Sequence, residues 1–180
     1  PADVQQSRFL SERIRQVRHF RSTKAKHPGV QASAESPHRF SRVQQPSGPY
    51  LCIPRHVPES YAHFPAAHFG SDIISGDANF VLDDPTGLFF AVVSSGMFMA
   101  WQKMVGGRIK NDPRFASTVT WNTFPLPPLG DSSLQAVVNA GAAVLAARSL
   151  TPDRSLAQMY EPGAMTPELL AAHEELDAAV

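Results

Sequence analysis

The sequence predicts an α+β fold, in which a domain built on a small mixed sheet precedes a helical C-terminal subdomain. Three observations predict it. Short apolar runs bounded by proline and glycine are typical of strands, and they fall in the first part of the chain. An apolar run at residues 86–105 has the length of a buried helix. After residue 129 the chain becomes alanine-rich, which favours helix. We therefore expect one domain at residues 1–128 and a helical region at residues 129–180.

The N-terminal part predicts a basic helix followed by a loop. Leu10, Ile14 and Val17 share one face at helical spacing, and arginines point away from it, so we expect a helix over residues 3–20 that packs on the core through this face. Residues 21–49 carry repeated proline and glycine and are expected to form a loop. Short strands are expected after it, at residues 50–53, 73–74 and 79–82.

The central apolar run predicts one long buried helix. Acidic residues before Pro85 and Thr86 form an entry signal, and the helix is expected to reach Val105 and to end at Gly106-Gly107, a candidate for a left-handed C-cap. Because this helix is apolar nearly all round, its methionines are expected to fill the core: Met97, Met99 and Met104.

The rest of the chain predicts one further strand and two helices. From Phe115 to Thr123 the side chains alternate with a period of two, which predicts a strand that ends at the following prolines. Asp131 is expected to cap an alanine-rich helix over residues 132–150. Thr166 and Pro167 are a typical cap and first turn for a last helix.

Composition limits the cellular setting. The chain has 180 residues, 43% of them hydrophobic, and no run approaches the roughly 18 apolar residues of a membrane span. Its first 20 residues are polar and rich in arginine, unlike a signal peptide. The single cysteine, Cys52, cannot form an internal disulfide and fits a reducing compartment. These features predict a cytoplasmic protein without a membrane partner.

The net charge of zero conceals an uneven distribution. Residues 1–60 hold ten Lys/Arg and four Asp/Glu, whereas residues 151–180 hold one Lys/Arg and six Asp/Glu. A basic half suggests a polyanionic partner, and ordinary solvated surface is the alternative. The arginines of the N-terminal helix allow the same two interpretations, a phosphate-contacting surface or a solvated helix face. The acidic C-terminal part could instead dock a partner subunit, which would make the chain a protein-interaction module.

Catalytic motifs are missing from the sequence. It contains no Walker loop, no GxGxxG motif for a dinucleotide and no GxSxG nucleophile motif. A glycine-rich loop for S-adenosylmethionine and an Asn/Asp-Pro-Pro-aromatic loop are also absent. The seven histidines are scattered, and no carboxylate stands at metal-ligand spacing. We therefore expect no catalytic residue, no metal and no bound cofactor in this chain, and an isolated hydrolase is disfavoured.

A short polar cluster after the apolar run is the strongest functional signal. Lys and Arg side chains can donate to the O6/N7 edge of guanine, and Asp can accept from cytosine N4, so a mixed cluster suits base reading better than neutralisation of phosphates. A solvated turn with an Arg–Asp surface pair is the alternative. The candidate DNA-binding residues are Arg108, Lys110, Asn111, Asp112 and Arg114.

The same region resembles a known family. The runs Met97-Phe98-Met99-Ala100-Trp101, Gly107-Arg108-Ile109-Lys110-Asn111-Asp112 and Trp121-Asn122-Thr123-Phe124-Pro125 are similar to the target recognition domain of MmeI-like (type IIL) restriction–modification DNA methyltransferases. The Ser155–Tyr160 segment and the helix after Pro167 resemble the family's C-terminal region. The sequence departs from the family pattern at Phe98, Pro113 and Phe115.

The resemblance implies the DNA-reading portion of a larger bacterial enzyme. In that family such a domain follows a methyltransferase domain that transfers a methyl group from S-adenosylmethionine to adenine N6. The expected partners are double-stranded DNA and the methyltransferase domain of the same parent chain. The family assigns base selection to the positions that match Lys110, Asp112 and Arg114, with lysine donating to a guanine and aspartate accepting from the opposite cytosine.

Overall fold

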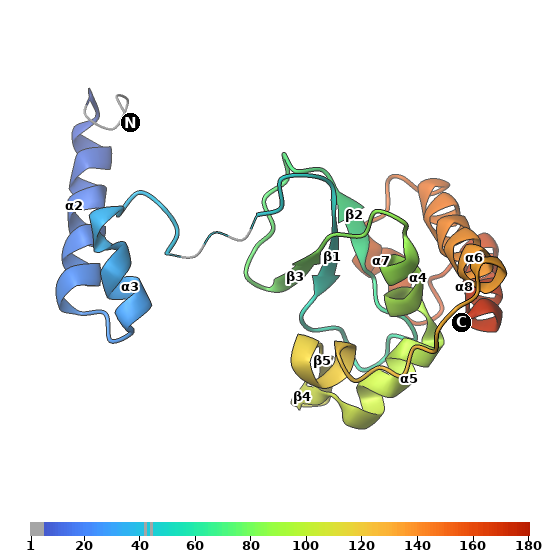
Figure 1. Ribbon diagram of the computed structural model, residues 1–180. Coiled ribbons are helices and arrows are strands. Elements are labelled where there is room, and N and C mark those ends of the chain that lie inside the picture. Colours follow the sequence, from blue (N-terminus) through green and yellow to red (C-terminus); the bar gives the residue numbers. More distant parts are fainter. Residues whose placement is uncertain (1–5, 42, 44) are drawn as a thin grey trace. The chain divides into compact units, whose positions relative to one another are not determined.

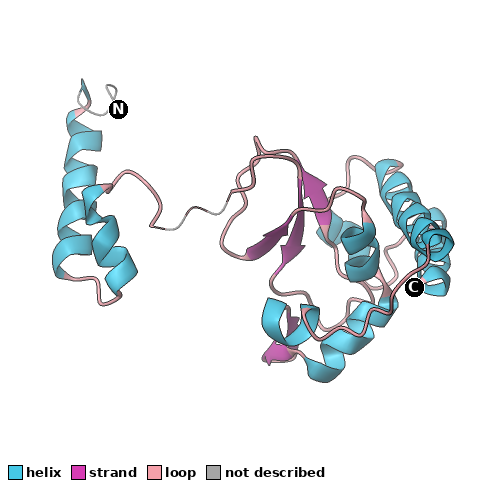
Figure 2. Ribbon diagram, viewed as in Figure 1, coloured by secondary structure: helices cyan, strands magenta, loops and turns pink. Residues whose placement is uncertain are grey.

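The computed structural model describes residues 6–41, 43 and 45–180, and it divides the chain into two compact units at residues 1–44 and 45–180 (Figures 1 and 2). The smaller unit contains α2 (Arg8–Thr23), α3 (Pro28–Ala32) and the short 3-10 helix η1 (Ser33–Glu35). Residues 3–5 of the expected N-terminal helix lie outside the described residues. Two short helices occupy part of the segment that was expected to be a loop.

The smaller unit holds together mainly through polar contacts. Arg21 near the end of α2 donates hydrogen bonds to the carbonyls of Ser33, Ser36 and Arg39. α2 packs against α3 and η1, yet it contains no buried residue. The expectation that its apolar face packs in a core is therefore wrong for this unit, which is too small to enclose that face.

The larger unit begins with a three-stranded antiparallel sheet in the order β2-β1-β3. Its strands are β1 (Tyr50–Pro54), β2 (Ala67–Phe69) and β3 (Asn79–Leu82). The strands expected at residues 50–53 and 79–82 are confirmed, and β2 was not anticipated. The strand expected at Ile73–Ile74 is wrong, because these exposed residues form a loop that is held by a hydrogen bond from the Tyr50 hydroxyl to the Ile73 carbonyl, 2.8 Å.

The central apolar run forms two helices rather than one, α4 (Leu88–Ser94) and α5 (Gly96–Val105), with a bend of 64° between them. Ser95 lies at the bend in an extended conformation. Its hydroxyl donates to the Val92 carbonyl at 2.8 Å and accepts from the Phe98 amide at 3.1 Å. Ser95 thus ends α4 and caps α5. The expected entry signal is confirmed at Asp84, whose carboxylate accepts from the Phe89 and Phe90 amides.

The bend also decides which methionines are buried. α5 turns Phe98, Met99 and Gln102 toward the core, so Met99 is only 2% exposed. Met97 and Met104 lie on the outer face at 56% and 84% exposure, and the expectation that they fill the core is wrong. Among the described residues, no single helix is long and apolar enough to cross a membrane; α4 and α5 reach that composition only as a bent pair.

A hairpin and an irregular helix follow α5. The hairpin consists of β4 (Gly107–Ile109) and β5 (Asp112–Arg114), and the π-helix η2 (Ser117–Trp121) comes next. The strand expected over residues 115–123 is therefore wrong, because β5 ends at Arg114 and residues 117–121 form η2. The Thr120 hydroxyl accepts from the Ala116 amide and donates to its carbonyl, so a local side chain satisfies backbone groups that a strand would have paired with a neighbour.

Three helices complete the larger unit, α6 (Asp131–Ser149), α7 (Leu156–Tyr160) and α8 (Pro167–Ala179), and α6 packs against both α4 and α8. Gly141 permits close approach, because a Cβ there would lie 2.7 Å from the Ala91 Cβ. The cap at Thr166 is confirmed by its bond from the Leu169 amide. Gly130, not Asp131, is the N-cap of α6.

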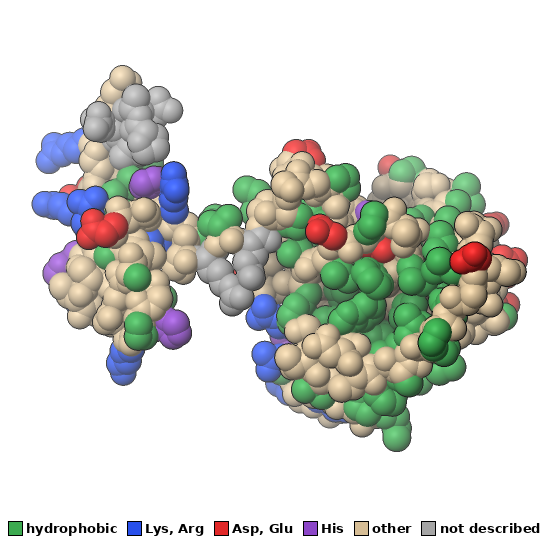
Figure 3. Space-filling model, in the orientation of Figure 1, with side chains coloured by type: hydrophobic (Ala, Val, Ile, Leu, Met, Phe, Trp, Pro, Cys, Tyr) green, Lys and Arg blue, Asp and Glu red, His purple; other side chains and the backbone are tan. Residues whose placement is uncertain are grey.

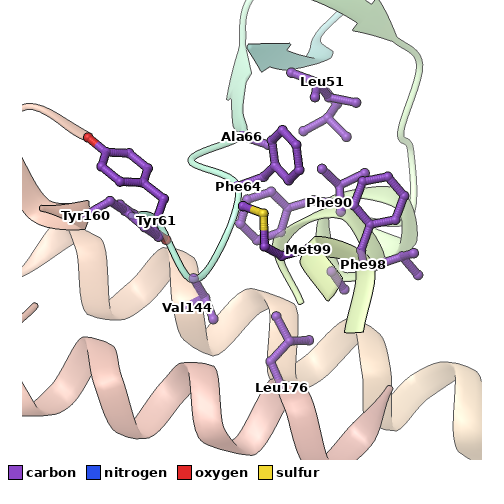
Figure 4. Close-up of a cluster of buried hydrophobic side chains, with 14 of the residues drawn as sticks. Leu51, Tyr61, Phe64, Ala66, Phe90, Phe98, Met99, Val144, Tyr160 and Leu176 are labelled. Atoms are coloured by element: carbon purple, nitrogen blue, oxygen red, sulfur yellow. The ribbon is translucent and has the colours of Figure 1, made fainter. Parts of the chain in front are cut away.

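One hydrophobic core joins the sheet to all the surrounding helices. Figure 4 shows this cluster, in which side chains from β1 and the segment after it meet side chains of α4, α5, α6 and α8. Phe98 and Phe115 also contact each other, with ring centroids 6.0 Å apart. The helical region is thus part of the same core as the sheet, and the observed architecture confirms the predicted α+β class.

A buried polar network crosses this core. The Arg148 guanidinium donates to the Ala66 carbonyl at 2.6 Å and to the Tyr160 hydroxyl. That hydroxyl lies 2.7 Å from Nε2 of His173, whose ring stacks on His63 with centroids 3.9 Å apart. Burial lowers the pKa of His173 from 6.5 to about 3, and the neighbouring His63 and Arg148 act in the same direction. His173 is therefore neutral in the folded protein at neutral pH.

This network predicts that folding stability falls in mild acid. The unfolded chain binds a proton at His173 near pH 6.5, whereas the folded chain does so only near pH 3. The contribution of His173 to the free energy of unfolding is therefore fully present above pH 6.5 and is lost as the pH falls below that value. We expect a slope of up to about 1.4 kcal/mol per pH unit from this residue. Denaturant unfolding between pH 4 and 8 measures it, and an unchanged slope in His173→Gln would contradict the assignment.

Candidate nucleic-acid interface

The hairpin brings all five candidate residues together on the surface. Its strands pair Gly107 with Arg114 and Ile109 with Asp112, which leaves Lys110 and Asn111 as a two-residue turn. All five candidate side chains are exposed. Lys110 has φ of 55°, the left-handed conformation that usually favours glycine and costs other residues about 1 kcal/mol. The left-handed cap expected at Gly106 is wrong, since its φ is −77° and its ψ is 160°.

The hairpin is anchored to the core through β5. On the edge of β5 that faces away from β4, the Phe115 amide donates to the Arg55 carbonyl at 2.9 Å, and the Val57 amide donates to the Pro113 carbonyl at 3.3 Å. Pro113 and Phe115 are buried, although Arg114 between them is exposed. A two-stranded hairpin alone is marginally stable in water, so these contacts fix where its tip points.

The candidate residues divide into two groups by their contacts. The Arg108 guanidinium donates to the carbonyls of Asn111 and Lys103 and lies 3.6 Å from the Glu59 carboxylate. One carboxylate oxygen of Asp112 accepts from the Glu59 amide at 3.1 Å. Arg108 therefore stabilises the turn of the hairpin, and Asp112 ties the hairpin to Glu59 through one of its two carboxylate oxygens.

The second group points outward without an internal partner. Within the described part of the chain, the side chains of Lys110 and Arg114 make no hydrogen bond or ion pair. The second oxygen of Asp112 is likewise not engaged by any described donor. The exposed surface of the hairpin, from its turn to the end of β5, thus offers two cations and one carboxylate oxygen to an external molecule.

The charge around the hairpin is opposite to that of the unit carrying it. Residues 45–180 hold seven Lys/Arg and thirteen Asp/Glu. Of the seven, Arg148 is buried and Arg154 bonds to the carbonyls of Ala164 and Gln158. The remaining five lie in the hairpin or in segments bonded to it, and they are named here the basic edge: Arg55, Lys103, Arg108, Lys110 and Arg114. Figure 3 shows Lys and Arg atoms along the edge that β4 and β5 form.

Sequence reasoning missed the residues that support the hairpin. Arg55 and Glu59 come from the segment after β1, and Gln102 comes from α5. The side-chain amide of Gln102 donates to the Arg114 carbonyl at 3.0 Å. Gln102, a polar residue in a largely apolar helix, was the signal that could have pointed to this contact. Across the described residues, no three His, Cys, Asp or Glu side chains group closely enough to hold a metal ion.

The structure thus presents an exposed, charged hairpin fixed to the core, and comparison with known proteins identifies the family of the chain. The MmeI target recognition domain matches residues 1–128, and the MmeI C-terminal domain matches residues 129–180. The chain belongs to the MmeI family, as a target recognition domain with its C-terminal domain. The resemblance seen in the sequence is confirmed.

Two relatives show the same similarity over nearly the whole chain. DNA methyltransferase A of Bacillus subtilis (strain 168) is 28% identical over 98% of this chain and 20% of its own length. The type IIL restriction-modification enzyme MmeI, solved in complex with DNA, superposes with a TM-score of 0.92 at 33% identity, over 99% of this chain and 24% of its own. The chain therefore spans about a fifth to a quarter of these relatives.

The two groups of hairpin residues predict different effects on stability. Arg108→Ala removes two hydrogen bonds and an ion pair that brace the turn, so we expect a loss of about 1 kcal/mol in unfolding free energy and faster amide exchange in the hairpin. Lys110→Ala removes no internal contact and should change stability by less than about 0.5 kcal/mol. Equal losses in the two variants, measured by denaturant unfolding, would contradict this division.

Proposed function

We propose that this chain reads the sequence of double-stranded DNA for a larger S-adenosylmethionine-dependent DNA adenine-N6 methyltransferase of the restriction–modification type. The observation that carries the proposal is the exposed surface of the hairpin, where Lys110, Asp112 and Arg114 present polar atoms without an internal partner among the described residues. Membership in the MmeI target recognition family and the strong similarity to an enzyme solved with DNA support it.

The size and chemistry of the hairpin suit the major groove. That groove is about 12 Å wide and admits a two-stranded ribbon. Lys110 donates to guanine O6 or N7, and the unengaged oxygen of Asp112 accepts from the N4 amino group of the paired cytosine. Arg114, at the end of β5, contacts a further base or a phosphate, and Asn111 lies beside Lys110 in the turn. Arg108 contributes by holding the turn as well as by its charge.

Electrostatics favour docking through the same edge. An acidic body repels DNA, so a duplex approaches the larger unit with lowest energy where its exposed cations gather. The smaller unit adds a second basic surface, because residues 1–44 hold nine Lys/Arg and three Asp/Glu. We assign it phosphate contacts, which strengthen binding without selecting sequence.

Catalysis belongs to the rest of the parent chain in this proposal. S-adenosylmethionine binds to the methyltransferase domain, and this chain supplies specificity by docking beside it on the same duplex. Within the 180-residue chain, we place the boundary between the target recognition domain and the C-terminal domain after residue 128. The isolated chain binds DNA more weakly than the parent enzyme, because the methyltransferase domain of the parent enzyme also contacts the duplex.

A protein-interaction module is the second candidate. α8 exposes Glu168, Glu174 and Glu175 together with Leu170, which is 48% exposed. An acidic helix with an apolar residue on its outer face suits a partner subunit better than DNA. In that case the C-terminal region, not the hairpin, would carry the principal binding activity.

The base-reading role predicts a loss of preference at one base pair. Lys110→Ala should lower discrimination there by about 1–3 kcal/mol, because the donor to guanine is gone. Selection of bound duplexes from a random pool measures it. Lys26→Ala, an exposed lysine in the smaller unit, is the matched control and should weaken binding without changing the selected sequence. Identical base preferences in Lys110→Ala and the unchanged chain would rule out this role.

The electrostatic role predicts a steep dependence on salt. A plot of the logarithm of the DNA association constant against the logarithm of salt concentration should be a falling line, with a slope of about −0.9 for each phosphate contact that the protein makes. If Lys26 contacts a phosphate, Lys26→Ala should make this slope shallower by about one. A double change of Glu174 and Glu175 to Gln should leave sequence preference intact. If DNA binding does not depend on salt and the double change of Glu174 and Glu175 abolishes it, the result would favour the protein-interaction module.

A further inference from the structure

Gln102 binds the backbone at the end of β5, where the chain passes from the surface into the core. Its side chain is 1% exposed, and its Nε2 atom donates to the Arg114 carbonyl at 3.0 Å. Arg114 is exposed, whereas Phe115, the next residue, is 3% exposed and packs among aromatic rings. The carbonyl that Gln102 binds belongs to the peptide linking these two residues. Its direction therefore affects the direction in which the Arg114 side chain leaves the strand.

Gly106 makes room for this contact. A Cβ at Gly106 would lie 1.8 Å from the Gln102 Nε2 atom and 2.5 Å from the Gln102 carbonyl oxygen. The second distance involves backbone that cannot move aside easily. The side chain of Gln102 thus occupies the space that any larger residue at position 106 would need, and the two residues form a matched pair between α5 and β4.

The choice of an amide at this position has no benefit for packing. The Gln102 Oε1 atom is buried and has no hydrogen-bond partner among the described residues. A buried polar atom without a partner is unfavourable, and an unbranched apolar side chain of similar length would fill the same volume without that penalty. The amide is therefore explained by what its donor does to Arg114.

We propose that Gln102 is a positioning residue for DNA reading: its hydrogen bond to the Arg114 backbone aims the Arg114 side chain at its base pair. The inference rests on the proposed function of the hairpin. It separates Arg114 from Lys110, because Lys110 lies in the turn at the other end of the strand and has no contact with Gln102. Loss of Gln102 should disturb one base contact and leave the other.

The test compares base preferences of single variants of the 180-residue chain by selection from a random duplex pool. Gln102→Met keeps length and removes the donor. We expect it to reduce preference at the base pair that Arg114→Ala also affects, by roughly 3- to 10-fold, and to preserve preference at the pair that Lys110→Ala affects. Met99→Leu, an equally buried change in the same helix, should alter neither preference.

Two further readouts separate positioning from a general structural effect. Gln102→Glu keeps the shape but faces the Arg114 carbonyl with a carboxylate, so it should reproduce the pattern of Gln102→Met. In the free protein, the Phe115 amide should exchange faster in both variants. The melting temperature of Gln102→Met should stay close to that of Met99→Leu, whereas Gln102→Glu should lower it, because it buries an unpaired carboxylate.

The outcomes distinguish the two proposals. If Arg114→Ala changes preference at one base pair and neither Gln102 variant does, positioning by Gln102 is wrong and DNA reading by the hairpin stands. If Gln102→Met weakens preference equally at both base pairs, it acts on the whole hairpin and the specific assignment is also wrong. If neither Arg114→Ala nor Lys110→Ala changes any preference, the proposed function of the hairpin fails, and the role of Gln102 fails with it.

Discussion

The backbone contacts of β5 are the constraint on which the candidate interface depends. A short hairpin has too little buried surface to fix its own direction. Here one strand pairs with β4 on one edge and with the Arg55–Val57 segment on the other, then continues directly into Phe115 in the core. The exposed hairpin is thereby attached to the hydrophobic core. Side chains on such a support can discriminate between ligands by position as well as by charge.

Charge is organised around the same structure. The zero net charge of the chain hides a basic smaller unit and an acidic larger one, and the exposed cations of the larger unit, Arg108, Lys110 and Arg114, all lie in the hairpin. Arg108 is partly committed to bracing the hairpin through backbone carbonyls, and Lys103 donates to the carbonyls of Glu59 and Tyr61 in the segment after β1. Bracing and the proposed recognition therefore use the same kind of residue, and the hydrogen bonds of Arg108 distinguish it from Lys110 and Arg114.

Local signals in the sequence were sufficient where a single residue decides the structure. Thr166 and Asp84 mark helix starts because their oxygens bind nearby amides. The break at Ser95 was missed because it also depends on a distant residue: the Asp177 carboxylate, from α8, accepts from the Gly96 amide at 2.6 Å. Likewise, the contiguous hairpin residues were predictable as a cluster, whereas Gln102 and the segment after β1 join them only through the fold.

Mapping the DNA-bound surface residue by residue tests the central claim most directly. Backbone amide resonances of the chain would be followed while a duplex carrying its selected sequence is added at moderate salt. Base reading by the hairpin predicts that the largest shifts fall at residues 107–114, with smaller shifts in the basic helix of the smaller unit. Shifts confined to α8, with residues 107–114 unchanged at saturation, would contradict it.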